Sequence, residues 1–283
     1  MGDPAITDAA AADLCTSGGC LEWSVASSDA ELAACQLWDL GASAIEERRC
    51  ATAMLLIAGF DDLEGLNEAL SLIPDAVRHA EVAEWLDTWK AHATPYCVAG
   101  QLTIVPAWCD LPDGVCGHVV RIDPGSSFGL LHVTTQLGLE ALIAAVQPAS
   151  SVLDVGSGSG ILSIAAARLG AVRVCAIDIE STAVVDTGRN ALLNGVAHIV
   201  DAHQRPIASI VDEFDVVVAN LGGAEVLVAM AEDLRRVTRV GGQLVLGGLL
   251  DVNLDVCLAA FEWATEVSRE HRDGWNVIVM APR

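Results

Sequence analysis

A short glycine-rich stretch, Asp154-Val-Gly156-Ser-Gly158-Ser-Gly160, lies between a predicted strand and a predicted helix. Glycines at such a turn permit unusual backbone angles and let a ligand approach the main chain. The first turn of the following helix offers free N–H groups, which favour an anion. A turn of this composition can therefore hold a phosphate or a carboxylate of a bound ligand.

A carboxylate follows at the end of the next predicted strand. Asp178 lies 22 residues beyond Gly156, and an acid there can accept hydrogen bonds from both hydroxyls of a ribose. Charge-assisted hydrogen bonds of this kind contribute about 1.5–3 kcal/mol each. Ligands of doubly wound sheets bind outside the carboxyl ends of the strands. The glycine turn and the acid together predict a site for a nucleoside cofactor.

The glycine spacing separates two classes of cofactor. Dinucleotide sites favour G-x-G-x-x-G, whereas this chain has G-x-G-x-G with Asp154 two residues before the first glycine. That form resembles the first motif of class I S-adenosylmethionine-dependent methyltransferases. Asn220, at the end of a later strand, and the turn and strand over 240–246 are also similar to these enzymes. A nicotinamide-dependent oxidoreductase is the disfavoured alternative.

The elements that would position these residues alternate between strand and helix from Ser151 onward. Short apolar strands between amphipathic helices indicate a parallel sheet covered on both faces. Asp273-Gly274 is a tight-turn signal near the end, so the last strand is predicted to be antiparallel. The expected strands are seven, over 152–155, 172–178, 198–202, 216–220, 243–246, 265–271 and 275–281.

The residues before this region predict a second, smaller domain. Residues 1–18 are rich in Ala, Asp, Ser and Gly and are expected to form a mobile tail. Signals over 19–83 follow the order β-α-β-β-α-β, that of a ferredoxin-like α+β unit. A linking helix is expected over 84–94 and a methyltransferase domain over 95–283. The predicted fold is α/β, a Rossmann-like seven-stranded doubly wound sheet with a small N-terminal ferredoxin-like domain.

The charge balance limits the possible partners. The chain has 283 residues, 38 acidic and 15 basic side chains, a net charge of −23, and Lys90 as its single lysine. A phosphate backbone needs Lys and Arg, so nucleic acid is excluded as a main partner. An anionic membrane surface is disfavoured for the same reason. A basic partner is the electrostatically natural one.

Composition also bears on the compartment. An apolar content of 53% permits a large core and excludes general disorder. No apolar run approaches the roughly 18–20 residues of a membrane span, and the N-terminus lacks the features of a signal peptide. The expected location is therefore the cytoplasm. Nine scattered cysteines without a C-x-x-C pair predict reduced, buried thiols and no metal site.

Longer stretches resemble the PrmA family, whose members methylate ribosomal protein L11. The stretch over 123–135 (DPGSSFGLLHVTT) is similar to the family signature D-P-G-x-x-F-G-T-G-x-H-x-T-T. Residues 84–95 (EWLDTWKAHATP) look like its linker, and 104–108 like its next strand. With 152–164 and 217–221, the resemblance covers about residues 19–283.

The resemblance implies S-adenosyl-L-methionine as cofactor. Thr135, Gly156, Asp178 and Asn220 fall on cofactor-contacting positions, and Gly158 of the same loop is added to them. Asn220 is also the expected catalytic residue, which would orient an amine. The implied reaction is N-methylation of lysine and/or N-terminal amines of L11, a basic protein partner recognised by the N-terminal domain. Thr135 has a second interpretation as a helix cap.

Two segments depart from the family pattern. Leu130-Leu131 stand where the family has T-G-T, and Gly222-Gly223 follow Asn220-Leu where the family has N-I-L-A. Two alternatives therefore stay open. One is a PrmA-like methyltransferase for a different protein or a small-molecule amine, and the other is a cofactor-binding protein without catalysis.

Three further residues are weaker candidates. His132 could be proposed as a base, but a lone histidine in a loop is more often structural. Asp154 is expected to tie the glycine turn together through backbone N–H groups. Asp201 or Ala202 is expected in the zone where related enzymes meet the adenine.

Overall fold

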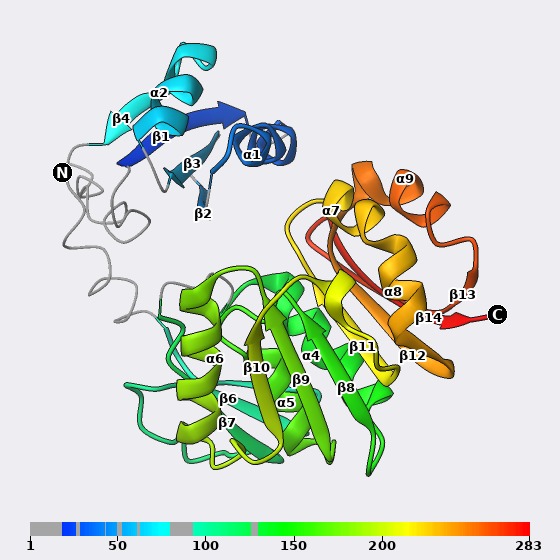
Figure 1. Cartoon of the computed structure of the whole chain (residues 1–283). Coiled ribbons are helices and arrows are strands. Elements are labelled where there is room, and N and C mark those ends of the chain that lie inside the picture. The colour runs from blue at the N-terminus through cyan, green and yellow to red at the C-terminus, as the bar shows by residue number, and fades with distance from the viewer. Residues whose placement is uncertain are drawn as a thin grey trace. The chain divides into compact units, whose positions relative to one another are not determined.

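The structure is a computed structural model that describes residues 19–26, 29–42, 44–49, 53–60, 63–79, 93–125 and 130–283 (Figure 1). The chain divides into two compact units, Met1–Ala93 and Thr94–Arg283. The tail expected over 1–18 and nearly all of the helix expected over 84–94 lie outside the described residues. Each unit has a hydrophobic core of its own.

The N-terminal unit is a four-stranded antiparallel sheet with two helices. Successive side chains of a strand point to opposite faces, and Met54, Leu56 and Ala58 accordingly share a core with Leu37 and Leu66 of the helices. The sheet order is β2-β3-β1-β4. The element order is the expected one, while the ferredoxin-like class stays a prediction. The elements are β1 (Gly19–Ala26), α1 (Ala30–Asp39), β2 (Ala44–Arg49), β3 (Ala53–Phe60), α2 (Leu63–Leu72) and β4 (Val77–His79).

The second unit is built on a seven-stranded sheet of order β10-β9-β8-β11-β12-β14-β13. The first five strands of this order are mutually parallel, and β14 is antiparallel to both of its neighbours. Asp273 and Gly274 both have positive φ, as the tight turn before β14 requires. The predicted doubly wound sheet is thereby confirmed. Its strands are β8 (Ser151–Val155), β9 (Arg173–Asp178), β10 (Val200–Gln204), β11 (Phe214–Asn220), β12 (Thr238–Leu250), β13 (Ala264–Arg272) and β14 (Trp275–Pro282).

Helices cover both faces of this sheet because its central strands are apolar on both sides. Leu153 and Val155 pack with Leu227 and Leu234 of the later helices on one face. Helices α4 and α5 pack on the sheet strands as well, and Asp154 points to α5 on the opposite face. The helices are α4 (Val133–Ala145), α5 (Ile161–Arg168), α6 (Ser181–Leu193), η1 (Ile207–Ser209), α7 (Ala224–Ala229), α8 (Ala231–Val237), η2 (Asp251–Asn253) and α9 (Leu254–Ala259).

A small sheet of β5 (Tyr96–Val98), β6 (Leu102–Pro106) and β7 (His118–Ile122) precedes the large one. The sequence predicted one strand over 97–105, but the chain turns at Ala99-Gly100, where both residues have positive φ. A disulfide joins Cys97 and Cys116, so the expectation of reduced thiols is wrong for this pair. Within the described residues, no helix is long and apolar enough to span a membrane.

Candidate active site

The glycine loop connects β8 to α5 at the carboxyl edge of the large sheet. Gly156, Gly158 and Gly160 have φ values of 74°, 52° and 78°, a region that residues with side chains rarely adopt. The backbone N–H groups of Gly156 and Ser157 donate to the Ile177 carbonyl at 2.8 and 3.1 Å. The loop is therefore tied to the neighbouring strand β9, which leads to the predicted acid.

Asp178 is the last residue of β9 and contacts the glycine loop directly. Its Oδ2 accepts a hydrogen bond from the Gly158 N–H at 2.9 Å, and its Oδ1 accepts one from the Glu180 N–H at 3.0 Å. A carboxylate offers about four acceptor positions. Each oxygen of Asp178 can therefore accept a further hydrogen bond in addition to the one from the backbone.

Asp154 is buried beneath the loop. Its Oδ2 accepts a hydrogen bond from the Ser163 hydroxyl of α5 at 2.6 Å, so it is tied to this helix, whereas a contact with the turn was expected. Its Oδ1 has no hydrogen-bond partner among the described residues. Burial raises the pKa of Asp154 to about 6.

Asn220 ends β11 at the point where the strand order reverses between β8 and β11. Such a switch point is where doubly wound folds bind ligands. The Oδ1 atom of Asn220 is buried without a hydrogen-bond partner among the described residues. A Cβ at Gly247 of β12 would lie 2.5 Å from this oxygen. A side chain at position 247 would therefore collide with Asn220, whereas glycine leaves space for it.

The side chains of Asp154 and Asn220 belong to one face of the sheet. Asp154 pairs with Val218 in the parallel register, and Asn220 lies two residues further along the same strand. Because side chains alternate along a strand, residues two apart share a face. The two buried, unpartnered oxygens therefore lie on neighbouring strands and on the same side of the sheet.

Thr135 lies buried in the first turn of α4. In the described part of the chain, no hydrogen bond joins it to the other four predicted site residues. The helix cap is His132, whose Nδ1 accepts from the Thr134 N–H at 3.3 Å. The helix begins one residue earlier than predicted, so the cap interpretation of Thr135 is wrong.

Burial lowers the pKa of His132 to about 4, and its ring meets that of Trp275 edge-on at 5.2 Å. These contacts support the structural interpretation of His132.

The register of β10 shows where the residues expected near the adenine lie. Gln204 pairs with Asp178 at the carboxyl edge, whereas Asp201 pairs three residues earlier, inside the sheet. The strand begins two residues later than the sequence predicted, which shifts its end from Ala202 to Gln204. The Asp201 side chain is exposed and pairs with His203 at 2.9 Å. Gln204 therefore lies at the carboxyl edge beside Asp178, and an adenine contact of Asp201 or Ala202 stays a prediction.

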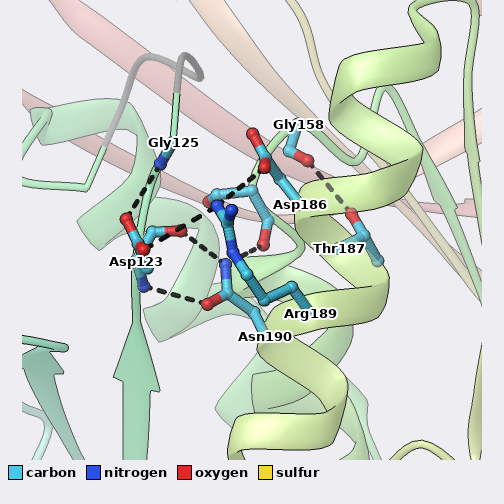
Figure 2. Close-up of polar contacts among 8 residues, drawn as sticks. Asp123, Gly125, Gly158, Asp186, Thr187, Arg189 and Asn190 are labelled. Atoms are coloured by element: carbon cyan, nitrogen blue, oxygen red, sulfur yellow. Dashed lines mark hydrogen bonds and ion pairs between the residues drawn. The ribbon is translucent and has the colours of Figure 1, made fainter.

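A polar stripe that the sequence motifs did not indicate runs along α6 to its C-cap residue Asn194. Thr187, Asn190 and Asn194 are buried although α6 lies at the surface of the unit. Residues three or four apart share a face of a helix, and this spacing was the available signal. Figure 2 shows that Thr187 and Asn190 point from α6 toward the loops at the sheet edge.

These features together define a class. A seven-stranded doubly wound sheet with a glycine turn after its first strand and an acid after its second is that of class I S-adenosylmethionine-dependent methyltransferases. The polar atoms of the site fit the cofactor. Asp178 can accept hydrogen bonds from ribose hydroxyls. The buried Oδ1 atoms of Asp154 and Asn220 have no donor among the described residues.

The comparisons then give the family. A family model described as ribosomal protein L11 methyltransferase (PrmA) matches residues 24–283, and the chain belongs to this family. The L11 methyltransferase of Sorangium cellulosum is 35% identical over 244 residues, 80% of this chain and 77% of the relative. That of Geobacter sulfurreducens is 45% identical over 168 residues, 59% of this chain and 55% of the relative. S-adenosyl-L-methionine is the cofactor.

A solved structure is also similar. The ribosomal protein L11 methylase from Lactobacillus delbrueckii subsp. bulgaricus aligns with a TM-score of 0.63 and 31% identity, covering 68% of this chain and 100% of that chain. The resemblance noted from the sequence and the predicted fold of the large sheet are thus confirmed.

Proposed function

We propose that this chain methylates lysine and/or N-terminal amines of ribosomal protein L11 with S-adenosyl-L-methionine. The observation that carries the proposal is the buried Oδ1 of Asn220, which has no hydrogen-bond partner among the described residues and lies at the switch point of a chain in this family. A relative named for L11 methylation that is 35% identical over most of both chains supports the substrate.

Asn220 is the proposed catalytic residue. The cofactor supplies a methyl group on a positively charged sulfur that an amine displaces directly, so positioning of the amine is the main requirement. The Asn220 oxygen would accept a hydrogen from the amine and thereby aim the nitrogen lone pair. No strong base is needed when water takes the proton before the amine enters the site.

The substrate amine must first become neutral. A lysine has a pKa of about 10.4, so neutralising it at pH 7 costs roughly 4–5 kcal/mol. A dry, buried site lowers that cost because desolvation disfavours the charged form. Carboxylates that attract a basic substrate would oppose this, so we place them on the docking surface and away from the methyl position.

The predicted cofactor residues have distinct proposed roles. Gly156 and Gly158 would present the main chain to the methionine carboxylate, and Asp178 would accept from the ribose hydroxyls. Thr135 and Asn220 would complete the contacts. Each carboxylate oxygen of Asp178 accepts one backbone N–H. These hydrogen bonds hold the carboxylate beside the glycine loop, which supports its proposed contact with the ribose.

The N-terminal unit is the proposed substrate-recognition domain, over residues 19–83. Its separate core supports an independent docking role. The acidic chain, at −23, suits a basic protein rather than nucleic acid or a membrane, and the cytoplasm is the proposed location.

The test is transfer of a labelled methyl group to purified L11 by the full chain. Label on L11 is expected, and Asn220→Ala is expected to lower turnover at least about tenfold. No label despite cofactor binding would refute L11 as substrate and favour a cofactor-binding protein or a different amine.

Cofactor binding to matched variants tests the ribose assignment. Asp178→Ala is expected to weaken calorimetric binding at least about tenfold, since a charge-assisted bond is lost. Asp212→Ala is the control, because this exposed acid pairs with Arg173 at the opposite end of β9 from Asp178. Equal affinities for the two variants would discard the role of Asp178.

A further inference from the structure

Asn190 joins three parts of the site through one side chain. It is fully buried in the last turn of α6. Its Oδ1 accepts from the Asp123 N–H at 2.9 Å, and its Nδ2 donates to the carbonyls of Asp123 at 2.7 Å and Ser159 at 2.9 Å. Asp123 directly follows the last residue of β7, and Ser159 belongs to the glycine loop. A single amide therefore fixes the separation of two loops.

The glycine loop is held to α6 at a second point. The Thr187 hydroxyl lies 3.0 Å from the Gly158 carbonyl and 3.1 Å from the Ser157 hydroxyl, as Figure 2 shows for Gly158. A Cβ at Gly160 would come within 2.9–3.0 Å of Thr187. Helix and loop are thus in direct contact along most of the loop.

The turn after Asp123 is held by the same helix. Gly125 N–H donates to the Asp123 carboxylate at 3.3 Å, and Arg189 lies 3.8 Å from that carboxylate and 2.7 Å from Asp186. A Cβ at Gly125 would overlap the Asp186 carboxylate. Figure 2 shows these side chains gathered between α6 and the turn. The turn begins the segment whose sequence resembles the family signature.

We propose that Asn190 is a positioning residue that sets the spacing between the glycine loop and the Asp123–Gly125 turn, and so shapes the cofactor pocket. The inference rests on the proposed function only in taking the glycine loop as a cofactor contact. Asn190 acts through the two loops and does not itself touch the cofactor.

Asn194 provides a matched control one helical turn away. It is also buried, and it makes three hydrogen bonds: Oδ1 accepts from the Arg121 N–H at 2.8 Å, and Nδ2 donates to the carbonyls of Arg121 at 2.6 Å and Asn190 at 2.8 Å. Both asparagines therefore clamp the end of β7 onto α6. Only Asn190 also reaches the glycine loop.

The experiment compares Asn190→Ala and Asn194→Ala in the full chain. Unfolding by urea is expected to show similar losses of stability, because each variant loses three buried hydrogen bonds. Calorimetry with S-adenosyl-L-methionine is expected to show about tenfold weaker binding for Asn190→Ala and less than about twofold for Asn194→Ala. Hydrogen exchange of the cofactor-free protein should accelerate over residues 156–160 in the first variant alone.

Thr187→Val keeps the inference testable where Asn190→Ala does not fold. It removes only the hydroxyl tether at nearly unchanged volume, and binding is expected to weaken about three- to tenfold. Equal affinities of the Asn190 and Asn194 variants, or wild-type affinity for both Asn190→Ala and Thr187→Val, would overturn the inference. If the wild type binds the cofactor but transfers no methyl group to L11, the assigned substrate is overturned and the role of Asn190 is not.

Discussion

Two buried oxygens, Oδ1 of Asp154 and Oδ1 of Asn220, set the energetics of the site. A buried acceptor without a donor costs about 1–3 kcal/mol, and both atoms lie on one side of adjacent strands. Asn220 lies at the switch point, where a ligand donor could reach its oxygen. Cofactor binding is therefore expected to raise the stability of the fold through this residue.

His132 gives this chain a defined sensitivity to acid. Burial lowers its pKa in the folded state to about 4, below the value of about 6.5 in an unfolded chain. The unfolded state therefore takes up the proton first. Above pH 6.5, the neutral His132 contributes roughly 3 kcal/mol to the free energy of unfolding. This contribution is lost as the pH falls toward 4, with more than about 1 kcal/mol gone by about pH 5.5.

His132→Asn is expected to remove this dependence while preserving the helix cap, because asparagine is a strong N-cap residue. The variant should lose stability at neutral pH through its missing contact with Trp275. Its deficit against the wild type should shrink by about 1 kcal/mol between about pH 7.5 and pH 5.5 in urea unfolding. A constant difference across this range would show that His132 is not held neutral by the fold.

The predictable residues were those that follow a strand. Gly156, Gly158, Asp178 and Asn220 were located because strand ends and glycine turns have clear signals, and the structure places them at one sheet edge. Asn190 was missed because its role depends on loops distant in sequence. The helical spacing of Thr187, Asn190 and Asn194 marks a shared face, but it does not indicate which loops that face contacts.

At the scale of elements, errors arose where strand ends lacked a signal. Strand β10 starts at Val200 and ends at Gln204, two residues later at each end than predicted. The hairpin between β5 and β6 turns at Ala99-Gly100, and the apolar residues on both sides of this turn had favoured a single strand. By contrast, α6 was predicted with its observed bounds, because its apolar periodicity and flanking residues agree.

The disulfide between Cys97 and Cys116 links β5 to the segment before β7. A crosslink that closes a loop of about 20 residues stabilises by about 3 kcal/mol in the chain-entropy treatment. Reduction of the wild type is therefore expected to lower its melting temperature by about 6–12 °C for a chain of this size.

The Cys97→Ser, Cys116→Ser double variant is the control. Its melting temperature should match that of the reduced wild type and should not respond to reductant. Alkylation before and after reduction, followed by peptide mass analysis, would establish whether the two cysteines are paired. Equal melting temperatures of oxidised and reduced wild type would contradict a stabilising crosslink.

At the scale of the whole molecule, the large sheet was predictable because every level of the sequence agreed on it. Alternating strands and helices, the glycine turn and the Asp273-Gly274 hairpin all indicate one topology, which the structure has. The division into two units agrees with separate cores. Recognition of a protein substrate depends on surfaces and partner shape, to which strand and helix signals do not respond, so it stays a proposal.

The net charge of −23 predicts how substrate capture responds to salt. A basic protein should be steered toward this chain by long-range attraction, which salt screens over about 8–10 Å at physiological ionic strength. Raising the salt from about 50 mM to about 300 mM is therefore expected to lower kcat/KM for L11 about tenfold, chiefly through a slower association.

Cofactor affinity provides the internal control for this effect. Calorimetric binding of S-adenosyl-L-methionine should change less than about twofold over the same range, because its contacts are short and enclosed rather than long-range. A parallel fall in cofactor affinity would indicate a general loss of the folded site. A kcat/KM for L11 that is independent of salt would show that the acidic surface does not guide docking, and would leave shape complementarity at the N-terminal unit as the basis of recognition.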